Sequence, residues 1–292
     1  MNRSQFLEHV GWTGAGVAFT LGAAGTMVPL AAGASAATIG FVQISDSHIG
    51  FHQPANKDVA ASLQTTVDRI NAMPVQPAFV VHTGDVTHLA KPAQFDEAKQ
   101  ILGGLHAPLV VLPGEHDVIG GPKAFFDAFG TPRDTPGWSS FDRDGIHFVS
   151  LVNVFNFEKM GLLGSDQLTW LERDLHAQKR DTPIVVFGHV PLYALYPAWG
   201  WTTEDGAKAL ALLARFSAVT VLNGHIHQVL SHVEGTIAFH TAYATAYPQP
   251  APGAAEKPGP LVVPKSQLLG MLGYRRVKVM GGATTVDEST LL

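Results

Sequence analysis

Five short apolar runs along the chain each end abruptly at an aspartate, a glutamate or a histidine. The runs are residues 39–44, 79–81, 109–112, 184–187 and 219–222, and most of their residues are Val, Ile, Leu or Phe. Strands that are buried on both faces of a sheet show such continuous runs, whereas strands with one exposed face alternate. The pattern therefore predicts five buried strands of a parallel or mixed sheet.

The segments between these strands carry apolar residues at helical spacing. They predict helices over residues 58–72, 92–103, 167–177 and 204–216. Asp144-Gly145 sits between alternating apolar positions, so the segment 138–154 is expected to form a hairpin in a second sheet. The proline-rich segment 248–264 reads as an irregular loop that rims the site, and closing strands follow near 275–279. Strands that alternate with helices indicate the α/β class, with one domain over residues 37–292.

The polar residues that end the five strands are of the kinds that bind metal ions. In chain order they are Asp46 and His48, then Asp85, then Glu115, His116 and Asp117, then His189, and finally His225 and His227. In open α/β sheets the carboxyl ends of strands face one crevice, so five such ends can deliver their side chains to one place. Glycine precedes the first polar residue in four of the five clusters, where a sharp turn or a close approach of two chains is needed. The constellation predicts a site for two metal ions, and because the chain contains no cysteine the ligands must be oxygen and nitrogen.

The composition and net charge limit the kinds of molecule that the protein is expected to bind. The chain has 292 residues, 46% of them hydrophobic, which is enough for a substantial core. Its formal net charge is −5, and no basic stripe is visible, which argues against a dedicated nucleic-acid surface. A phosphate group is therefore expected to be bound locally, by metal, as part of a small molecule.

The first 36 residues read as an export signal. A short polar start that contains Arg3 leads into an apolar Ala/Gly-rich stretch, and Ala34-Ser35-Ala36 matches a cleavage pattern. Residues 2–7 resemble the twin-arginine signal, with Asn2 where the first arginine would stand, while general secretion is the other route. The interpretation implies an exported protein that uses the export machinery and keeps no membrane span after the leader is removed; a buried helix or a membrane anchor is the competing interpretation.

The order of the clusters from Ile39 to His227 resembles the calcineurin-like metallophosphoesterase family. That resemblance implies two packed mixed sheets flanked by helices, a four-layer sandwich that holds two metal ions. Carried over by position, the roles would be Asp46, His48 and His227 on the first metal, His189 and His225 on the second, and Asp85 bridging both. The segment 164–171 also looks like the family's connecting helix, and Gly188-His189-Val190-Pro191 looks like its histidine motif.

One departure from the family affects the second metal. The family usually has Gly-Asn-His-Asp or Gly-Asn-His-Glu where this chain has Gly114-Glu115-His116-Asp117, so a carboxylate stands in place of a neutral amide ligand. A working site in which Glu115 ligates the second metal is the first interpretation. The alternative is an exported metal-binding or scaffold protein with the same fold and little turnover.

Further roles follow from position. The resemblance implies that His116 donates to the phosphate or protonates the leaving oxygen, and that Asp117 orients the His116 ring; a purely structural pair is the alternative. His88 is an extra ligand of the first metal, a substrate contact or a loop histidine, and His82 is a packing residue within its strand. Aromatic residues could shape a pocket for a ring-bearing leaving group or simply pack in loops; they are Tyr193, Tyr196, Trp199 and Trp201, together with Tyr243, Tyr247 and the neighbouring His240.

The chemistry expected from these residues is phosphoester hydrolysis in which a hydroxide that bridges two metal ions attacks phosphorus. The ligands would suit divalent or mixed-valence ions, namely Mn, Fe or Zn. The Gly-His-Val-Pro-Leu run of residues 188–192 looks most like the cyclic-nucleotide phosphodiesterase branch, so phosphodiesters are favoured over phosphomonoesters.

Overall fold

The computed structural model describes residues 19–21, 27–29, 38–132, 135–156 and 160–292. Contacts divide the chain into two units, Met1–Ala37 and Thr38–Leu292. In the first unit, β1 (Phe19–Leu21) pairs antiparallel with β2 (Met27–Pro29). Apart from these two strands, the predicted leader and its cleavage pattern lie outside the described residues and stay a prediction. Among the described residues, no helix is both long and apolar enough to cross a membrane.

The second unit contains a five-stranded mixed sheet. Its strands, in spatial order, are β13 (Ala283–Thr290), β12 (Gly273–Met280), β3 (Thr38–Ile44), β4 (Val80–His82) and β5 (Leu109–Val111). β3, β4 and β5 run parallel, as predicted for the first three apolar runs. β12 is antiparallel to both of its neighbours, so the closing strands near residues 275–279 are confirmed.

A six-stranded mixed sheet faces the first one. Its strands, in spatial order, are β10 (Ser231–Glu234), β11 (Ile237–Thr241), β9 (Val219–Asn223), β8 (Ile184–Gly188), β7 (Ile146–Ser150) and β6 (Ser139–Arg143). β6 and β7 form the hairpin predicted around Asp144-Gly145, and β7, β8 and β9 run parallel. The edge pair β10–β11 was not predicted from the sequence.

Helices cover the outer faces of both sheets. They are α2 (Val59–Asn71), α3 (Pro92–Leu102), α4 (Lys123–Phe129), α5 (Ser165–His176), α6 (Gly206–Leu213) and α7 (Lys265–Leu268). Three single-turn 3-10 helices are η1 (Glu115–Val118), η2 (Pro197–Trp199) and η3 (Leu269–Met271). Asp58 caps α2 by accepting a hydrogen bond from the Ala61 N–H, and Pro92 occupies the first turn of α3, as expected.

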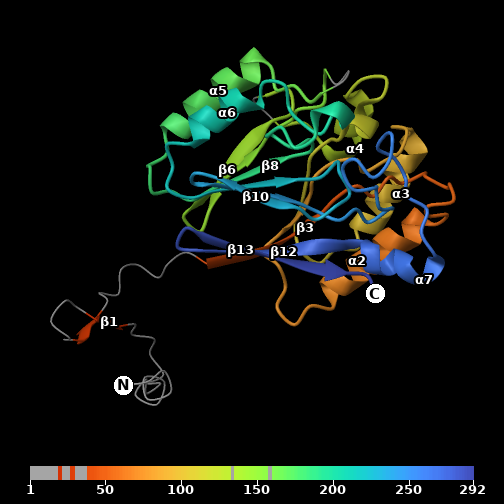
Figure 1. Ribbon diagram of the computed structural model, residues 1–292, viewed down its shortest axis with the longest axis horizontal. Coiled ribbons are helices and arrows are strands. Elements are labelled where there is room, and N and C mark those ends of the chain that lie inside the picture. Colours follow the sequence, from red (N-terminus) through yellow and green to blue (C-terminus); the bar gives the residue numbers. More distant parts are fainter. Residues whose placement is uncertain (1–18, 22–26, 30–37, 133–134, 157–159) are drawn as a thin grey trace. The chain divides into compact units, whose positions relative to one another are not determined.

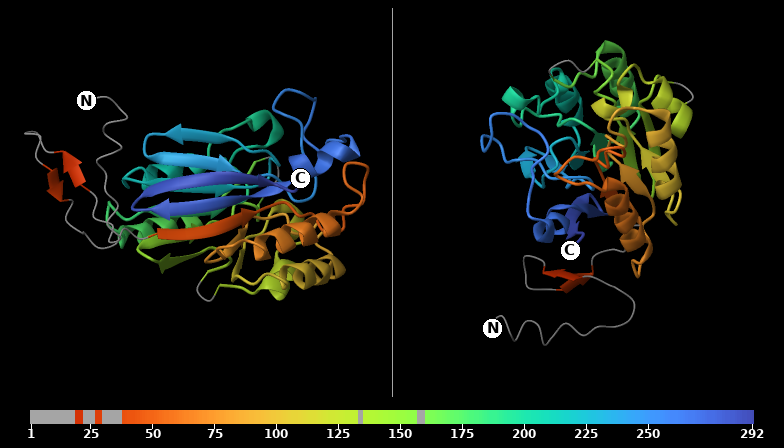
Figure 2. Two further views of the ribbon diagram at one scale, coloured as in Figure 1. Left: turned by 90° about the horizontal axis from the view of Figure 1, so that it is seen from below. Right: turned by 90° about the vertical axis from the view of Figure 1, so that its right-hand side faces the viewer.

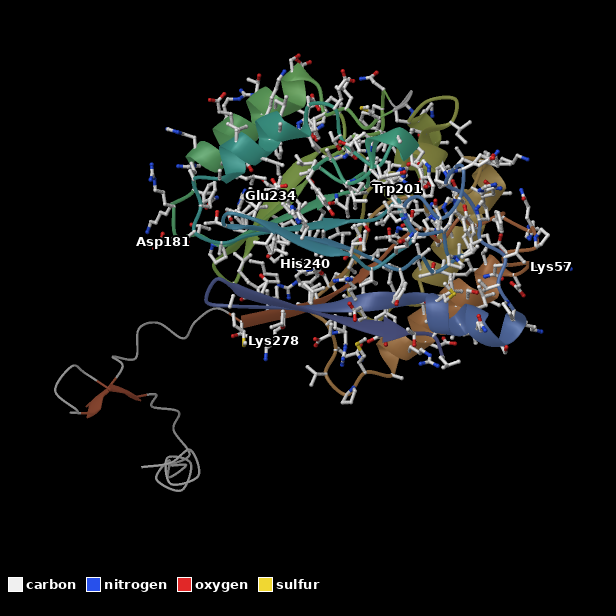
Figure 3. The ribbon with its side chains drawn as sticks, in the orientation of Figure 1. Lys57, Asp181, Trp201, Glu234, His240 and Lys278 are labelled. Carbon is white, nitrogen blue, oxygen red and sulfur yellow. The ribbon has the colours of Figure 1, made fainter. Side chains whose placement is uncertain are left out.

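Alternation along each strand sends side chains to two different cores. In β3, Phe41 faces Phe148 and Phe187 of the opposite sheet, whereas Val42 packs in the cluster that contains α2 and α3. The outer face of the six-stranded sheet packs against α5 and α6 (Figure 1, Figure 2). Side chains fill the space between the two sheets (Figure 3). The result is the predicted four-layer arrangement, in which two mixed sheets lie between helices.

Candidate metal centre

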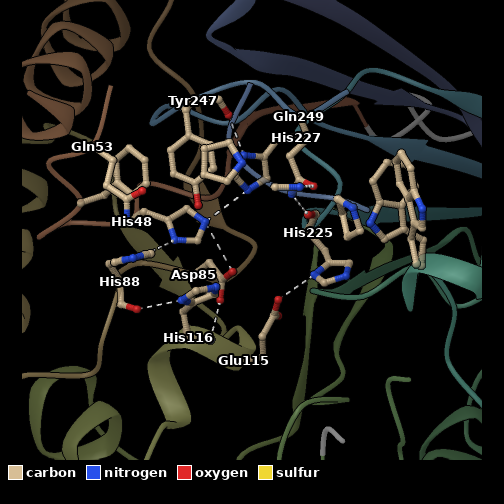
Figure 4. Close-up of a pocket in the computed structure, with 16 residues that line it drawn as sticks. His48, Gln53, Asp85, His88, Glu115, His116, His225, His227, Tyr247 and Gln249 are labelled. Atoms are coloured by element: carbon tan, nitrogen blue, oxygen red, sulfur yellow. Dashed lines mark hydrogen bonds and ion pairs between the residues drawn. The ribbon is translucent and has the colours of Figure 1, made fainter. Parts of the chain in front are cut away.

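The predicted site residues gather around one cavity of about 480 Å³ at the carboxyl ends of the parallel strands (Figure 4). The residues that line it include His48, Asp85, His88, Glu115, His116, His225 and His227. Asp46 and His189 are completely buried and lie against these side chains. Of the ten residues proposed for the site, Asp117 alone points elsewhere.

The backbone is strained at the ligand positions. Seven non-glycine residues in the described chain have positive φ angles, and five of them are predicted ligands: Asp46, His48, Asp85, His225 and His227. Left-handed backbone at a residue with a side chain costs about 1–3 kcal/mol and persists where the surrounding structure enforces it. The concentration of this strain at one place is what a functional site shows.

Two of the glycines that precede ligands are required by close approach. Gly84 has φ +102°, and a Cβ there would lie 2.4 Å from Nδ1 of His189. A Cβ at Gly114 would lie 2.1 Å from Oδ1 of Asp85. The turns after β4 and β5 can therefore approach the ligands only without side chains at these positions, as the sequence predicted.

The first group of ligand atoms comes from Asp46, His48 and His227. Nε2 of His48 lies 3.2 Å from Nε2 of His227, which in turn lies 3.3 Å from Oδ1 of Asp46. These atoms converge within 4.8 Å of one another. A cation between them would meet one carboxylate and two imidazoles, a set that suits Zn, Mn or Fe.

The second group comes from Glu115, His189 and His225. Glu115 lies 2.8 Å from Nε2 of His189 through Oε2, and 2.9 Å from Nδ1 of His225 through Oε1. The Glu115 carboxylate thus lies among the candidate ligand atoms of the second group. This is the position that the altered-ligand interpretation requires.

Asp85 joins the two groups. Its Oδ2 lies 3.5 Å from Nε2 of His48 in the first group and 3.4 Å from Nε2 of His189 in the second. Its Oδ1 accepts a hydrogen bond of 2.9 Å from the backbone N–H of His116. One carboxylate oxygen is therefore shared between two ligand groups, which is the geometry of a bridging ligand.

The tautomers of two buried histidines fit metal coordination. Nδ1 of His189 lies 2.7 Å from the Thr83 carbonyl, and Nδ1 of His227 lies 2.6 Å from the Tyr247 carbonyl. A carbonyl can only accept, so each ring carries its proton on Nδ1 and, when neutral, turns the Nε2 lone pair to the centre. The backbone carbonyls thus orient both rings as candidate ligands.

The carboxylates of Asp46 and Glu115 are held in their charged form. Burial alone would raise the pKa of the Asp46 carboxyl, but the adjacent His227 lowers that pKa to about 2. Burial likewise opposes ionisation of Glu115, and His225 and His189 nevertheless hold its pKa well below the usual value. Burial and the nearby His116 lower the pKa of His48, which keeps this ring neutral. Charged carboxylates and neutral imidazoles are the forms that bind cations.

Asp117 corrects one prediction. Its carboxylate does not accept a hydrogen bond from the His116 ring. The Nδ1–H of that ring is donated instead to the His88 carbonyl at 2.7 Å. Asp117 accepts hydrogen bonds from the backbone N–H groups of Val86, Thr87 and Gly114, and from the Thr87 hydroxyl. Burial and the charge of Asp85 raise the pKa of Asp117 to about 7. Asp117 therefore ties the turn after β4 to the turn after β5, and the role of orienting His116 belongs to a backbone carbonyl.

His82 contributes more than packing. Nδ1 of this buried ring accepts from the Gly84 N–H at 3.3 Å, so its proton lies on Nε2 and is donated to the Ser47 hydroxyl at 2.9 Å. Ser47 in turn donates to the Val86 carbonyl. The network supports Ser47, which lies between the candidate ligands Asp46 and His48. It was not predictable, because the strand reads as apolar around a single histidine.

Some of the aromatic residues line the cavity, and others pack away from it. Trp199, Trp201 and Tyr247 line the cavity. Tyr193 packs in the outer cluster, with its ring centroid 4.7 Å from that of Phe239. His240 interacts with Ser231 on the neighbouring strand. Gln249, Pro258, Gly259 and Pro260 complete one wall, so the loop 248–264 does rim the site.

Comparisons with known proteins place these observations in a family. A family model described as calcineurin-like phosphoesterase matches residues 39–229. The chain is 28% identical over 220 residues to a probable cyclic nucleotide phosphodiesterase of Rhodopseudomonas palustris, which covers 71% of this chain and 78% of that protein. It is 30% identical over 201 residues to a glycerophosphodiester phosphodiesterase of Enterobacter lignolyticus. This match covers 64% of this chain and 70% of that protein.

The fold is also similar to that of a solved phosphatase. A dimetal phosphatase from Danio rerio superimposes with a TM-score of 0.61 at 14% identity, over 87% of this chain and 99% of that chain. At this identity the likeness concerns the fold alone. The scaffold alternative gains no support from these comparisons, since the two relatives carry the names of phosphodiesterases.

Proposed function

Because the chain belongs to the calcineurin-like phosphoesterase family and is a metal-dependent phosphoesterase, we propose that it hydrolyses phosphodiesters in preference to phosphomonoesters. The observation that carries the metal chemistry is the shared position of Asp85 Oδ2, 3.5 Å from His48 and 3.4 Å from His189. The proposed ligands are Asp46, His48 and His227 for one ion, Glu115, His189 and His225 for the other, and Asp85 for both.

The charge around the cavity favours a diester. Of the described residues that line it, none is a lysine or an arginine. A phosphodiester carries one negative charge at neutral pH, whereas a phosphomonoester carries nearly two, because its second pKa is near 6. With no lysine or arginine in this lining, the second charge of a monoester would be balanced chiefly by the ions.

Glu115 strengthens this preference. The proposed ligand set contains three carboxylates, those of Asp46, Asp85 and Glu115. Two divalent ions would bring four positive charges, so the three carboxylates and the attacking hydroxide would leave the centre neutral, whereas a neutral amide at position 115 would leave one positive charge. The less positive centre favours the single charge of a diester over the two charges of a monoester.

When bound, the two ions would supply Lewis acidity and would activate water near neutral pH. The chain's own groups then divide the remaining work. The His116 ring is oriented by the His88 carbonyl, which accepts from Nδ1 at 2.7 Å and leaves Nε2 for the substrate. Burial opposes a charge on this ring, but the charges of Asp85 and Glu115 raise the pKa of His116, so that Nε2 can carry a proton as well. The imidazolium can then give its Nε2 proton to the leaving oxygen and become neutral. Trp199, Trp201 and Tyr247 add aromatic surface to the cavity lining.

A direct comparison of two model substrates tests the proposal. The metal-free protein is reloaded with Mn²⁺, and kcat/KM is measured for bis(4-nitrophenyl) phosphate and for 4-nitrophenyl phosphate. We expect the diester to be favoured by at least about tenfold, a difference of about 1.4 kcal/mol in the barrier. A preference for the monoester would contradict the proposed substrate class, and bound metal without any turnover would support the scaffold alternative.

Glu115→Asn tests the carboxylate at the second ion. The substitution restores the family's amide and removes one negative charge, so we expect the second Mn²⁺ to bind at least about tenfold more weakly, as losses around metal sites commonly do. At saturating Mn²⁺ the ratio of monoester to diester hydrolysis should rise. The measurements are Mn²⁺ binding isotherms and kcat/KM for both substrates.

Glu97→Asn is the matched control, because Glu97 is exposed on α3 and is not among the residues that line the cavity. It should leave both quantities unchanged. If Glu115→Asn also leaves the metal content and the rates unchanged, then Glu115 does not ligate the second ion.

A further inference from the structure

His88 lies between a proposed ligand of the first ion and the open cavity. Its Nδ1 lies 3.4 Å from Nδ1 of His48, and its side chain lines the cavity wall (Figure 4). The sequence left its role open between an extra ligand, a substrate contact and a surface histidine. The contact of its Nδ1 with His48 bears on this choice.

The ring of His48 uses its two nitrogens in opposite directions. Nε2 faces the ligand group, 3.2 Å from Nε2 of His227 and 3.5 Å from Oδ2 of Asp85. An imidazole that coordinates through Nε2 carries its proton on Nδ1 and usually donates it to a neighbouring acceptor. The atom placed to accept that proton is Nδ1 of His88.

The proton on His88 is thereby assigned to the other nitrogen. A neutral imidazole has one donor and one acceptor, so a ring that accepts through Nδ1 must carry its proton on Nε2. Nδ1 of His88 is then engaged with His48 and does not point its lone pair at an ion. In this arrangement Nδ1 of His88 has no lone pair left for a bond to the first ion.

The plane of the His88 ring is fixed by its neighbours. It stacks on His116, with centroids 5.0 Å apart and an interplanar angle of 18°, and meets the edge of Phe51 at 5.2 Å and 87°. Its own carbonyl accepts from Nδ1 of His116. A ring held in this way presents its donor in one direction, in a cavity whose described lining offers no lysine or arginine to a phosphate oxygen.

We propose that His88 has two roles: it accepts the Nδ1–H of His48 and so positions that ligand, and it donates its Nε2–H to a non-bridging oxygen of the bound phosphodiester. The second role rests on the proposed function, whereas the first concerns metal binding alone. Loss of the two roles should therefore affect two different measurements.

Two amide substitutions separate these roles, because each reproduces one ring nitrogen. The asparagine amide lies near the position of Nδ1, so His88→Asn keeps an acceptor for His48 but removes the outer donor. The glutamine amide lies near the position of Nε2, so His88→Gln keeps an outer donor but loses the inner acceptor. His88→Ala removes both.

The measurements are the stepwise binding of Mn²⁺ to metal-free protein, followed by electron paramagnetic resonance, and kcat and KM for bis(4-nitrophenyl) phosphate at saturating Mn²⁺. For His88→Asn we expect unchanged Mn²⁺ binding and a KM raised by about tenfold or more, the effect of losing a hydrogen bond to a charged group. For His88→Gln we expect Mn²⁺ binding at one site to weaken by about 10–100-fold, with KM nearly unchanged. His106→Asn and His106→Gln, at an exposed histidine, should change neither quantity.

The outcomes that overturn the proposal are distinct. If the Asn and Gln variants behave alike, or if His88→Ala binds Mn²⁺ and substrate as the wild type does, His88 has neither separable role. If His88→Ala loses one Mn²⁺ completely and His88→Asn does not restore it, His88 is itself a ligand. If the wild type binds two Mn²⁺ ions but hydrolyses no diester, the proposed function fails while the Mn²⁺ results still test the positioning role.

Discussion

Asparagine in place of Asp85 is expected to leave the protein with one bound ion and to lower diester hydrolysis by at least about 10³-fold. The fold should survive, because Asn can keep the hydrogen bond that Oδ1 accepts from the His116 N–H and tolerates the positive φ of this position. The change falls on Oδ2, the atom shared between His48 and His189. An amide nitrogen there has no lone pair to bridge two cations.

The size of the expected loss follows from what two ions do together. A pair of ions contributes several kcal/mol of transition-state stabilisation, and about 4 kcal/mol corresponds to a factor of about 10³. The measurements are metal content by mass spectrometry and kcat/KM for bis(4-nitrophenyl) phosphate. Both should fall together.

Asp96→Asn is the matched control. Asp96 is exposed on α3, so this substitution makes the same chemical change away from the cavity. It should retain two ions and the full rate. The two-ion interpretation is wrong if Asp85→Asn keeps the wild-type rate with a single bound ion. Thermal unfolding of the metal-free proteins completes the test, because the variant should melt close to the wild type if Asp85 serves the ions rather than the fold.

The architecture was largely predictable because strands and helices leave different periods in the sequence. The run at residues 184–187 became β8, and the helical spacing after Asp58 became α2. The edge strand β10 escaped prediction because its residues Ser231–Glu234 are all exposed and carry no buried pattern. The short helix α4 was missed as well, since seven residues give too few turns for a periodic signal.

The convergence of the candidate ligands was predictable for a geometric reason. Parallel strands end at the same edge of a sheet, so a polar residue after each strand is carried to one place without any knowledge of the loops. The resemblance to a family then assigned the ligands to two groups, and the shared position of Asp85 agrees with that assignment.

The supporting contacts were not predictable in the same way. Asp117 takes its hydrogen bonds from backbone N–H groups at residues 86 and 87, about thirty positions earlier in the chain. Backbone donors have no side-chain signature, so the neighbouring His116 was the only partner that the sequence suggested. The contact between His48 and His88 spans forty residues and depends on two loops whose φ angles no sequence pattern specifies.

His116→Gln is expected to slow the hydrolysis of an alkyl diester by about 10²–10⁴-fold, the usual contribution of a general acid. Its effect on bis(4-nitrophenyl) phosphate should be less than about tenfold, since a nitrophenolate leaves readily without a proton. The reason lies in the orientation of the ring, whose Nδ1–H is donated to the His88 carbonyl so that Nε2 serves the cavity. Glutamine can still donate a hydrogen bond near the position of Nε2 but cannot transfer a proton from it.

The comparison that decides the role of His116 is therefore between leaving groups within one variant. Glycerophosphoethanolamine provides an alkoxide leaving group and bis(4-nitrophenyl) phosphate a stabilised phenolate, and kcat is measured for both at saturating Mn²⁺. His106→Gln, at an exposed histidine, is the control and should slow neither substrate. Equal losses for the two substrates would assign His116 to phosphate binding instead of proton transfer. A loss of bound Mn²⁺ would instead indicate that His116 is a ligand. Such a role is geometrically possible, because the candidate ligand atoms of Asp85, Glu115 and His116 lie within 4.8 Å of one another. Two retained ions together with a loss confined to the alkyl ester would leave protonation of the leaving oxygen as the role that accounts for both results.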